Sequence, residues 1–144
     1  MNKNIIRTRQ RARKLALQAL YQWMMSADNI VDIELQFITF NNMLKVDARY
    51  FHDLLCGVSQ NLVTVEQEFA GYLDRPLTSL NPVELTLLRI GTYELLYNLD
   101  IPYRIILDEA ISLNKEFGTK DGHRYVNGVL NQVARKIRYG EISS

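Results

Sequence analysis

Apolar side chains recur at spacings of three and four residues along most of the chain, which is the pattern of amphipathic helices. The clearest stripe follows Asp47, a candidate helix cap, and contains Phe51, Leu54, Leu55, Val58, Leu62, Val65, Phe69 and Tyr72. Similar spacing predicts helices over residues 9–26, 30–44, 81–99, 102–117 and 121–139. In the second of these, Phe40 and Leu44 are expected to face inward. No convincing strand pattern competes, so the predicted fold class is all-α.

The segment Asp74–Leu80, which contains Arg75-Pro76, interrupts the helical pattern and divides the chain. We therefore expect one domain over residues 1–144, a helical bundle of two packed three-helix subdomains at about 9–73 and 81–139. An amino-terminal arm, residues 1–8, precedes the first helix. Asn81-Pro82-Val83-Glu84 provides a cap, a proline at the first helical position and an acid in the first turn. The helix that follows is apolar on several faces, so we expect it to be central.

Composition excludes several classes of protein. A chain of 144 residues with 47% hydrophobic content can form one core. No apolar run approaches the roughly 20 residues that span a bilayer, and the polar start is unlike a secretory signal, so we expect a cytoplasmic protein. Cys56 is the only cysteine, which excludes an internal disulfide and a Cys-rich zinc site. His52 and His123 lack a matching nucleophile or ligand pattern, so we expect no catalysis, cofactor or metal.

Charge is divided unevenly along the chain. Residues 1–14 hold six of the 17 Lys and Arg residues and none of the 16 Asp and Glu residues. The formal net charge of +1 therefore combines a start of +6 with a remainder of −5. Such asymmetry favours a polyanionic partner, of which nucleic acid is the usual kind.

The first helix concentrates polar chemistry on one face. Its members recur three or four residues apart, opposite the apolar stripe; they are Arg7, Arg11, Lys14, Gln18 and Tyr21. Cations can neutralise phosphates, the amide can hydrogen-bond to a base edge, and the ring can stack on a base. The alternative is a solvated helix face with a frayed basic start.

The last helix offers a second basic face, made of Arg124, Gly128, Asn131, Arg135 and Arg138. The backbone amides at its start, with Lys120 and Arg124 beside them, are candidates to hold a phosphate, and Tyr125 is a candidate stacking ring. The alternative is an ordinary cap whose cations suit the negative end of the helix dipole. Gly128 implies close approach by a helix or a ligand, and we favour packing.

These motifs, in this order, resemble the NusB family of bacterial transcription antitermination factors over essentially the whole chain. The residues that carry the resemblance are Arg11-Ala12-Arg13 with residues 16–23, Tyr50-Phe51, Gly57-Val58, Glu84, Leu88-Arg89-Ile90, Tyr93-Glu94-Leu95, Ile101-Pro102-Tyr103, residues 108–111, Phe117-Gly118 and residues 125–130. The resemblance implies an all-helical, non-catalytic protein of two three-helix subdomains. It also implies pairing with the small-subunit ribosomal protein NusE and binding of boxA-type single-stranded RNA. These partners act with RNA polymerase and other Nus factors in antitermination, with no membrane and no DNA partner expected.

The resemblance places RNA binding at the arginine-rich start of the first helix and at the entry to the last. Together with the two basic faces, the candidates are Arg7, Arg9, Arg11, Arg13, Lys14, Gln18, Tyr21, Lys120, Asp121, Arg124 and Tyr125. Phe37 and Glu84 are candidates for the ribosomal-protein surface. Core packing is the favoured alternative for Phe37, and a capping role is the alternative for Glu84. Two other functions stay open: a helical protein-interaction scaffold, or an RNA-targeting module for a separate RNA-modifying enzyme.

Overall fold

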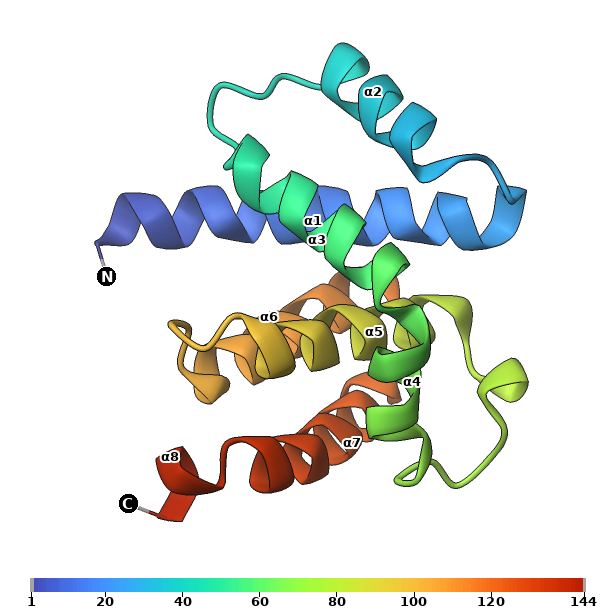
Figure 1. The fold of residues 1–144 in the computed structure, drawn as a ribbon, viewed down its shortest axis with the longest axis vertical. Coiled ribbons are helices and arrows are strands. Elements are labelled where there is room, and N and C mark those ends of the chain that lie inside the picture. Colours follow the sequence, from blue (N-terminus) through green and yellow to red (C-terminus); the bar gives the residue numbers. More distant parts are fainter. Residues whose placement is uncertain (1, 144) are drawn as a thin grey trace. The chain divides into compact units, whose positions relative to one another are not determined.

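The computed structural model describes residues 2–143, and every regular element in that range is helical (Figure 1). The α-helices are α1 (Lys3–Ser26), α2 (Ile30–Phe40), α3 (Ala48–Gln60), α4 (Leu62–Ala70), α5 (Pro82–Tyr97), α6 (Tyr103–Phe117), α7 (Gly122–Ile137) and α8 (Tyr139–Ser143), with a 3-10 turn, η1, at Leu77–Ser79. The all-α prediction is confirmed. No helix in this range is both long and apolar enough to cross a bilayer. The chain forms two compact units, one ending at Gln60 and the other beginning at Asn61.

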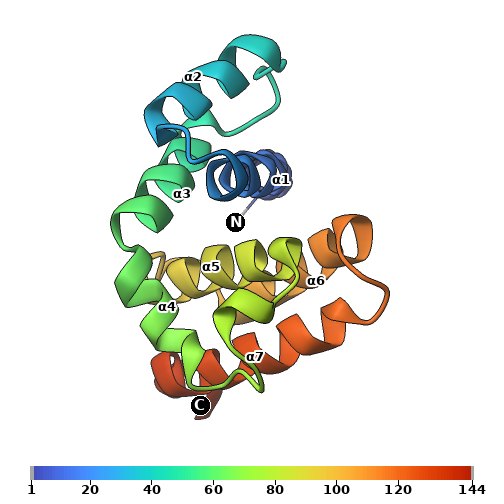
Figure 2. The same cartoon turned by 90° about the vertical axis from the view of Figure 1, so that its right-hand side faces the viewer.

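The first unit is built from α1, α2 and α3. Helix α1 packs against both other helices, and it is seen nearly end-on in Figure 2. Its buried side includes the small and branched residues Ala12, Ala16, Ala19 and Leu20, which permit close approach. Asn29 caps α2 by accepting from the Val31 N–H, and Asp47 accepts from the Tyr50 N–H at the start of α3. The cap predicted at Asp47 is confirmed.

Two boundaries in this unit differ from the prediction. The expected arm over residues 1–8 is helical from Lys3, because the Asn2 side chain accepts a hydrogen bond from the Ile5 N–H and so starts the helix earlier. Helix α2 ends at Phe40, where the side-chain amide of Asn41 donates to the Phe37 carbonyl. Phe40 and Leu44 are 81% and 90% exposed, so their predicted inward orientation was wrong.

In the second unit, α5 is the central element. Every residue of α5 from Glu84 to Leu95 is buried, and α4, α6 and α7 all contact it. Asn81 caps α5 by accepting from the N–H groups of Val83 and Glu84, and Pro82 takes the first helical position. The predicted cap and the predicted central helix are both confirmed.

The stripe predicted to form one long third helix is divided. Asn61 leaves the helical conformation at φ −116° and ψ 26°, which separates α3 from α4. Ion pairs join α4 to the second unit: Glu66 accepts from Arg89 of α5 at 2.8 Å, and Glu68 pairs with Lys136 of α7 at 3.2 Å. The boundary between the units therefore precedes α4 and does not lie in the Asp74–Leu80 segment.

Candidate nucleic-acid interface

The polar face predicted on the first helix is exposed in the structure. We call it the α1 ridge, and its members are Arg7, Arg11, Lys14, Gln18 and Tyr21. They lie opposite the buried alanines of α1, as the spacing predicted. No acidic residue occurs before Asp28, so the ridge carries no carboxylate of its own helix. The ridge can therefore attract phosphates where Arg7, Arg11 and Lys14 lie.

A shallow hollow of about 240 Å³ borders the α1 ridge; it is lined by Arg11, Lys14, Leu15, Gln18, Asn41, Asn42 and Val46. The guanidinium of Arg11 donates to the Lys45 carbonyl at 3.2 Å, which holds the α2–α3 loop beside the helix. Asn41 uses its amide nitrogen and Asn42 its amide oxygen in loop bonds. The amide oxygen of Asn41 and the amide nitrogen of Asn42 take no part in those bonds. A hollow of this size suits a single flat base better than a larger ligand.

Arg9 and Arg13 lie on a different side of α1. Their guanidinium carbons lie 5.0 and 5.4 Å from the centroid of the Tyr50 ring, in cation–π geometry. Arg13 is only 3% exposed. Contrary to the expectation that it contacts RNA, Arg13 is committed to packing α1 against α3. A buried guanidinium cannot reach a phosphate without losing that packing.

The second predicted patch lies where α7 begins. Lys120, Asp121 and Arg124 are exposed there. The Glu84 carboxylate, only 7% exposed, accepts from the Thr119 hydroxyl at 2.8 Å. A Cβ on Gly122 would collide with this carboxylate, so glycine is needed at the first position of α7.

The position of Glu84 bears on two expectations. The Glu84 carboxylate lies beside Gly122 at the start of α7, so its negative charge disfavours a phosphate on the backbone amides there. Phosphate contacts at this patch are therefore left to the side chains of Lys120 and Arg124. Glu84 is itself buried, which favours a structural role over the predicted contact with a partner protein.

Tyr125 is half-buried, and the connecting segment reaches its ring. The Arg75 guanidinium carbon lies 4.8 Å from the ring centroid, and the Asp74 N–H donates to the phenol oxygen at 3.4 Å. Burial is the main cause that raises the pKa of Tyr125, so the phenol is neutral at physiological pH. Hydrogen bonds from Arg75 and then Tyr125 lower the pKa of Asp74. Sequence reasoning missed Arg75 because it lies 50 residues from Tyr125.

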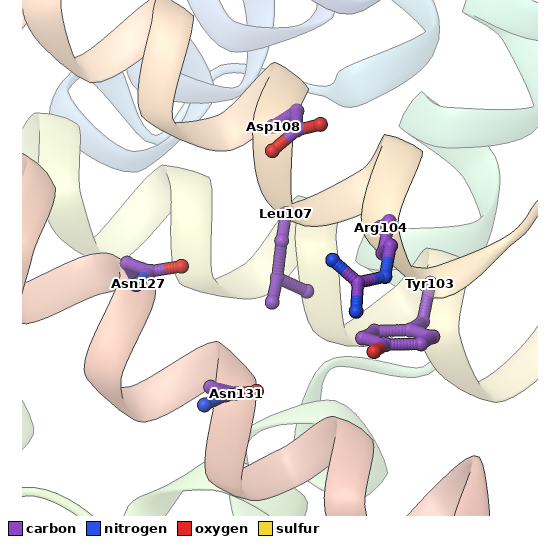
Figure 3. Close-up of a pocket in the computed structure, with 6 residues that line it drawn as sticks. All are labelled: Tyr103, Arg104, Leu107, Asp108, Asn127 and Asn131. Carbon is purple, nitrogen blue, oxygen red and sulfur yellow. The ribbon is translucent and has the colours of Figure 1, made fainter. Parts of the chain in front are cut away.

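A groove of about 310 Å³ lies between α6 and α7; it is lined by Tyr103, Arg104, Leu107, Asp108, Asn127 and Asn131 (Figure 3). Asn127 and Asn131 project from successive turns of α7, and the Arg104 guanidinium lies 5.6 Å from the Tyr103 ring centroid. Gly128 is exposed, and a Cβ there would meet nothing within 4 Å. Packing within the chain, the favoured explanation for this glycine, is therefore excluded among the residues that the structure describes.

Arg138 does not belong to the basic face predicted on the last helix. It is 6% exposed and donates to the carbonyls of Glu94, Leu95, Asn98 and Ile101 and to the Glu141 carboxylate. These bonds anchor the residue that follows α7 to the carboxyl end of α5 and to the segment after it, where the carbonyls of Glu94 and Asn98 also accept backbone N–H groups. The exposed row on α7 is thus shorter than predicted and ends at Arg135.

Phe37 has two kinds of neighbour. Its ring centroid lies 6.3 Å from that of Phe51, a core residue, in a tilted arrangement. It also lines a hollow of about 230 Å³ with Gln22, Gln36, Phe40 and Asn41. The favoured interpretation of core packing agrees with the first contact, and the hollow leaves one edge of Phe37 accessible.

The chain is similar in sequence to proteins of one known family. The NusB family model matches residues 10–135. The chain is 54% identical to the transcription antitermination protein NusB of Legionella pneumophila (strain Corby) over 143 residues, which cover 99% of this chain and 97% of that protein. It is 46% identical to the NusB protein of Alcanivorax borkumensis over 135 residues, which cover 94% and 90% of the two chains.

Solved structures share the fold. The structure of T. maritima NusB has a TM-score of 0.77 and 30% identity, covering 88% of this chain and 90% of that one. A crystal structure of the antitermination factors NusB and NusE in complex with double-stranded RNA contains a chain with a TM-score of 0.78 and 21% identity. That match covers 88% of this chain and 96% of the other. At this identity the second likeness concerns the fold alone.

Proposed function

The chain belongs to the NusB family, and from this membership we propose that it is a non-catalytic transcription antitermination factor that binds boxA-type single-stranded RNA. It acts as an adaptor that pairs with the ribosomal protein NusE and joins RNA polymerase and other Nus factors. Its place of action is the cytoplasm, where bacterial transcripts are made. RNA, not DNA, is its nucleic-acid partner.

The α1 ridge is the observation that carries this proposal. Its cations, its amide and its ring are all exposed on one face, beside a hollow that suits a single base. Single strands are bound by such combinations of cations that follow the phosphates and rings that stack on bases. A merely solvated face would not require an acid-free helix start or a hollow lined by two asparagine amides.

The start of α7 supplies the second contact. Lys120 and Arg124 would meet phosphates, and the Tyr125 ring, with Arg75 over one of its faces, would stack on an unpaired base. Asp121 is exposed and can accept from a base amino group or a ribose hydroxyl. Arg9 is only partly exposed and supports the ridge through Tyr50.

Pairing with NusE would use surfaces outside these contacts. The exposed edge of Phe37 and the neighbouring Phe40, at the hollow beside α2, provide apolar area of the kind that protein partners cover. Glu84 is buried, so we leave it out of this surface.

The test is a titration of a boxA RNA and a scrambled RNA of equal length and composition, with and without NusE, at two salt concentrations. We expect preference for boxA that is strengthened by NusE and weakened by salt. Binding to NusE with no RNA preference would instead favour the protein-interaction scaffold. Preference for a structured ribosomal RNA, independent of NusE, would favour a targeting module for an RNA-modifying enzyme.

A further inference from the structure

Helices α2 and α3 bring together three side chains of different ligand chemistry. They are Glu34 of α2 and His52 and Cys56 of α3. His52 and Cys56 are four residues apart, so they lie one above the other on the same helix face. One ligand atom from each of the three residues lies within 4.8 Å of the other two.

We propose that Glu34, His52 and Cys56 form a binding site for a borderline divalent metal ion, with Zn²⁺ as the preferred occupant. Thiolate and imidazole select ions of this class, whereas Mg²⁺ and Ca²⁺ prefer sites made of oxygen atoms. This site lies beyond the RNA-binding function, and it differs from the expectation that the chain has no metal ligand set. The periodicity of the sequence missed it because Glu34 and His52 lie on different helices.

Distances in the cluster agree with this assignment. Ligand atoms that share a tetrahedral Zn²⁺ ion at 2.0–2.3 Å lie about 3.3–3.8 Å from one another. The Cys56 Sγ lies 3.5 Å from His52 Nε2 and 3.7 Å from Nδ1. Glu34 Oε2 lies 2.7 Å from His52 Nδ1. These two atoms must therefore move apart by roughly 0.6 Å or more to share an ion.

Accessibility and charge favour entry of a cation. The His52 side chain is 58% exposed and that of Glu34 is 15% exposed, so an ion can approach from solvent and keep water at a fourth position. Burial, followed by the charges of Glu34 and Asp53, raises the pKa of the Cys56 thiol. The same two carboxylates attract a cation. When Zn²⁺ binds, the thiol proton is released to solvent and the sulfur coordinates as thiolate.

An occupied site would connect α2 to α3 within the unit that carries the α1 ridge. An ion bound only by the folded chain stabilises it by mass action, so the unfolding temperature would rise with Zn²⁺ concentration. The alternative is a hydrogen bond between His52 and Glu34 with a cysteine nearby, and this arrangement would not respond to Zn²⁺.

The test uses the full chain, stripped of metal by a chelator. Zn²⁺ affinity is measured by calorimetry, and Co²⁺ is used as a spectroscopic probe of the ligands. We expect Co²⁺ to give tetrahedral d–d bands and a thiolate charge-transfer band that is absent in Cys56→Ser. Each of Cys56→Ser, His52→Gln and Glu34→Gln should lower Zn²⁺ affinity by more than the roughly 10–100-fold that loss of an outer-shell partner causes.

His123→Gln is the matched control, because His123 is the only other histidine of the chain and lies outside the cluster. Its Zn²⁺ affinity should equal that of the wild type. Circular dichroism and the metal-free unfolding temperature establish that each variant is folded, and Glu34→Gln keeps the test informative if a change in α3 unfolds the chain. Absence of the charge-transfer band in the wild type, or equal Zn²⁺ affinity of wild type, Cys56→Ser and Glu34→Gln, would overturn the proposal.

Discussion

Arg75 covers one face of the Tyr125 ring, with its guanidinium carbon 4.8 Å from the ring centroid. Asp74 holds the same guanidinium through hydrogen bonds of 2.7 and 3.0 Å, and its N–H donates to the phenol oxygen. The connecting segment between α4 and η1 thus sets the environment of a ring at the start of α7. A base that stacks on Tyr125 either takes the opposite face of the ring or replaces Arg75.

Tyr125→Ala should weaken boxA RNA binding by roughly 1–3 kcal/mol, because a stacking ring is lost. Tyr125→Phe keeps the ring and should retain most of the affinity. Filter binding or fluorescence anisotropy of labelled RNA measures both variants, with circular dichroism as the control for folding. Wild-type affinity in a folded Tyr125→Ala protein would contradict the stacking role.

Replacing Arg11, Lys14 and Arg124 together with Ala should weaken RNA binding and flatten its salt dependence. Each phosphate contact on a single strand contributes about 0.7 to the slope of log affinity against log salt, so the slope should shrink by up to about 2. All three side chains are exposed, so the domain should stay folded.

A charge-matched control replaces Arg49, Lys115 and Lys136, which are exposed cations outside both patches. This control should keep the wild-type salt slope, although its Lys136 change removes the surface pair with Glu68. If both triple variants lost the same affinity and the same slope, binding would depend on net charge and not on the α1 ridge.

The spacing of apolar residues predicted the exposed ridge of α1, because the apolar stripe of an amphipathic helix determines which face turns toward the core. It did not identify the buried cations. Arg13 and Arg138 look like surface residues in the sequence, and only tertiary partners reveal their burial: the Tyr50 ring for Arg13, and carbonyls at the end of α5 for Arg138. Whether a guanidinium is buried depends on groups that are distant in the sequence, and a local sequence pattern does not contain them.

The division of α3 from α4 was hidden for a related reason. The apolar stripe continues through Leu62, Val65 and Phe69 with unbroken spacing, although the backbone leaves the helix at Asn61. A single non-helical residue changes the direction of the chain without changing the spacing of its apolar residues. Sequence therefore predicted the helix content and the caps of α3 and α5, but not which unit contains α4.

Arg138→Ala should lower the free energy of unfolding by roughly 3–5 kcal/mol, because it removes a buried guanidinium together with its hydrogen bonds to four carbonyls and to the Glu141 carboxylate. Arg135→Ala, three residues earlier on the exposed side of α7, is the matched control and should change stability by less than about 0.5 kcal/mol. Urea denaturation measures both. Similar losses in the two variants would contradict the anchoring role of Arg138.

Stability should also depend on the ionisation of Glu141. Burial alone would raise the pKa of this carboxyl, but hydrogen bonds from the Tyr103 N–H and from Arg138, with the Arg138 charge, lower it overall. A pKa that is lower in the folded chain stabilises the fold above the unfolded-state pKa. That contribution is lost as the pH falls through the folded-state pKa.

Glu141→Gln should therefore destabilise the chain at neutral pH, and its difference from the wild type should shrink below about pH 4, the usual range of a glutamate. Denaturation curves at a series of pH values measure this difference. A constant difference from neutral to acidic pH would show that the loss comes from packing and not from the charge of Glu141.

Substitution of Gly128 tests whether the glycine is required for packing within the chain or for contact with a binding partner. A Cβ at Gly128 would meet nothing within 4 Å, whereas a Cβ at Gly91 would lie 2.8 Å from Leu130 Cδ1. Gly128→Ala should therefore stabilise α7 by about 0.5–1 kcal/mol through helix propensity. Gly91→Ala should destabilise the core by about 1–3 kcal/mol through overpacking.

Binding experiments on Gly128→Ala then test whether a binding partner requires glycine at this position. Gly128 lies on the exposed row of α7 and adjoins Asn127 of the α6–α7 groove, so a ligand backbone that approaches there would collide with an added methyl group. We expect the stabilised Gly128→Ala protein to bind either RNA or NusE less tightly than the wild type, since no residue that the structure describes requires a glycine there. Titration with each partner separately identifies which one makes the approach. Unchanged affinity for both, in a protein with raised stability, would show that this surface is not contacted and that the glycine only weakens the helix.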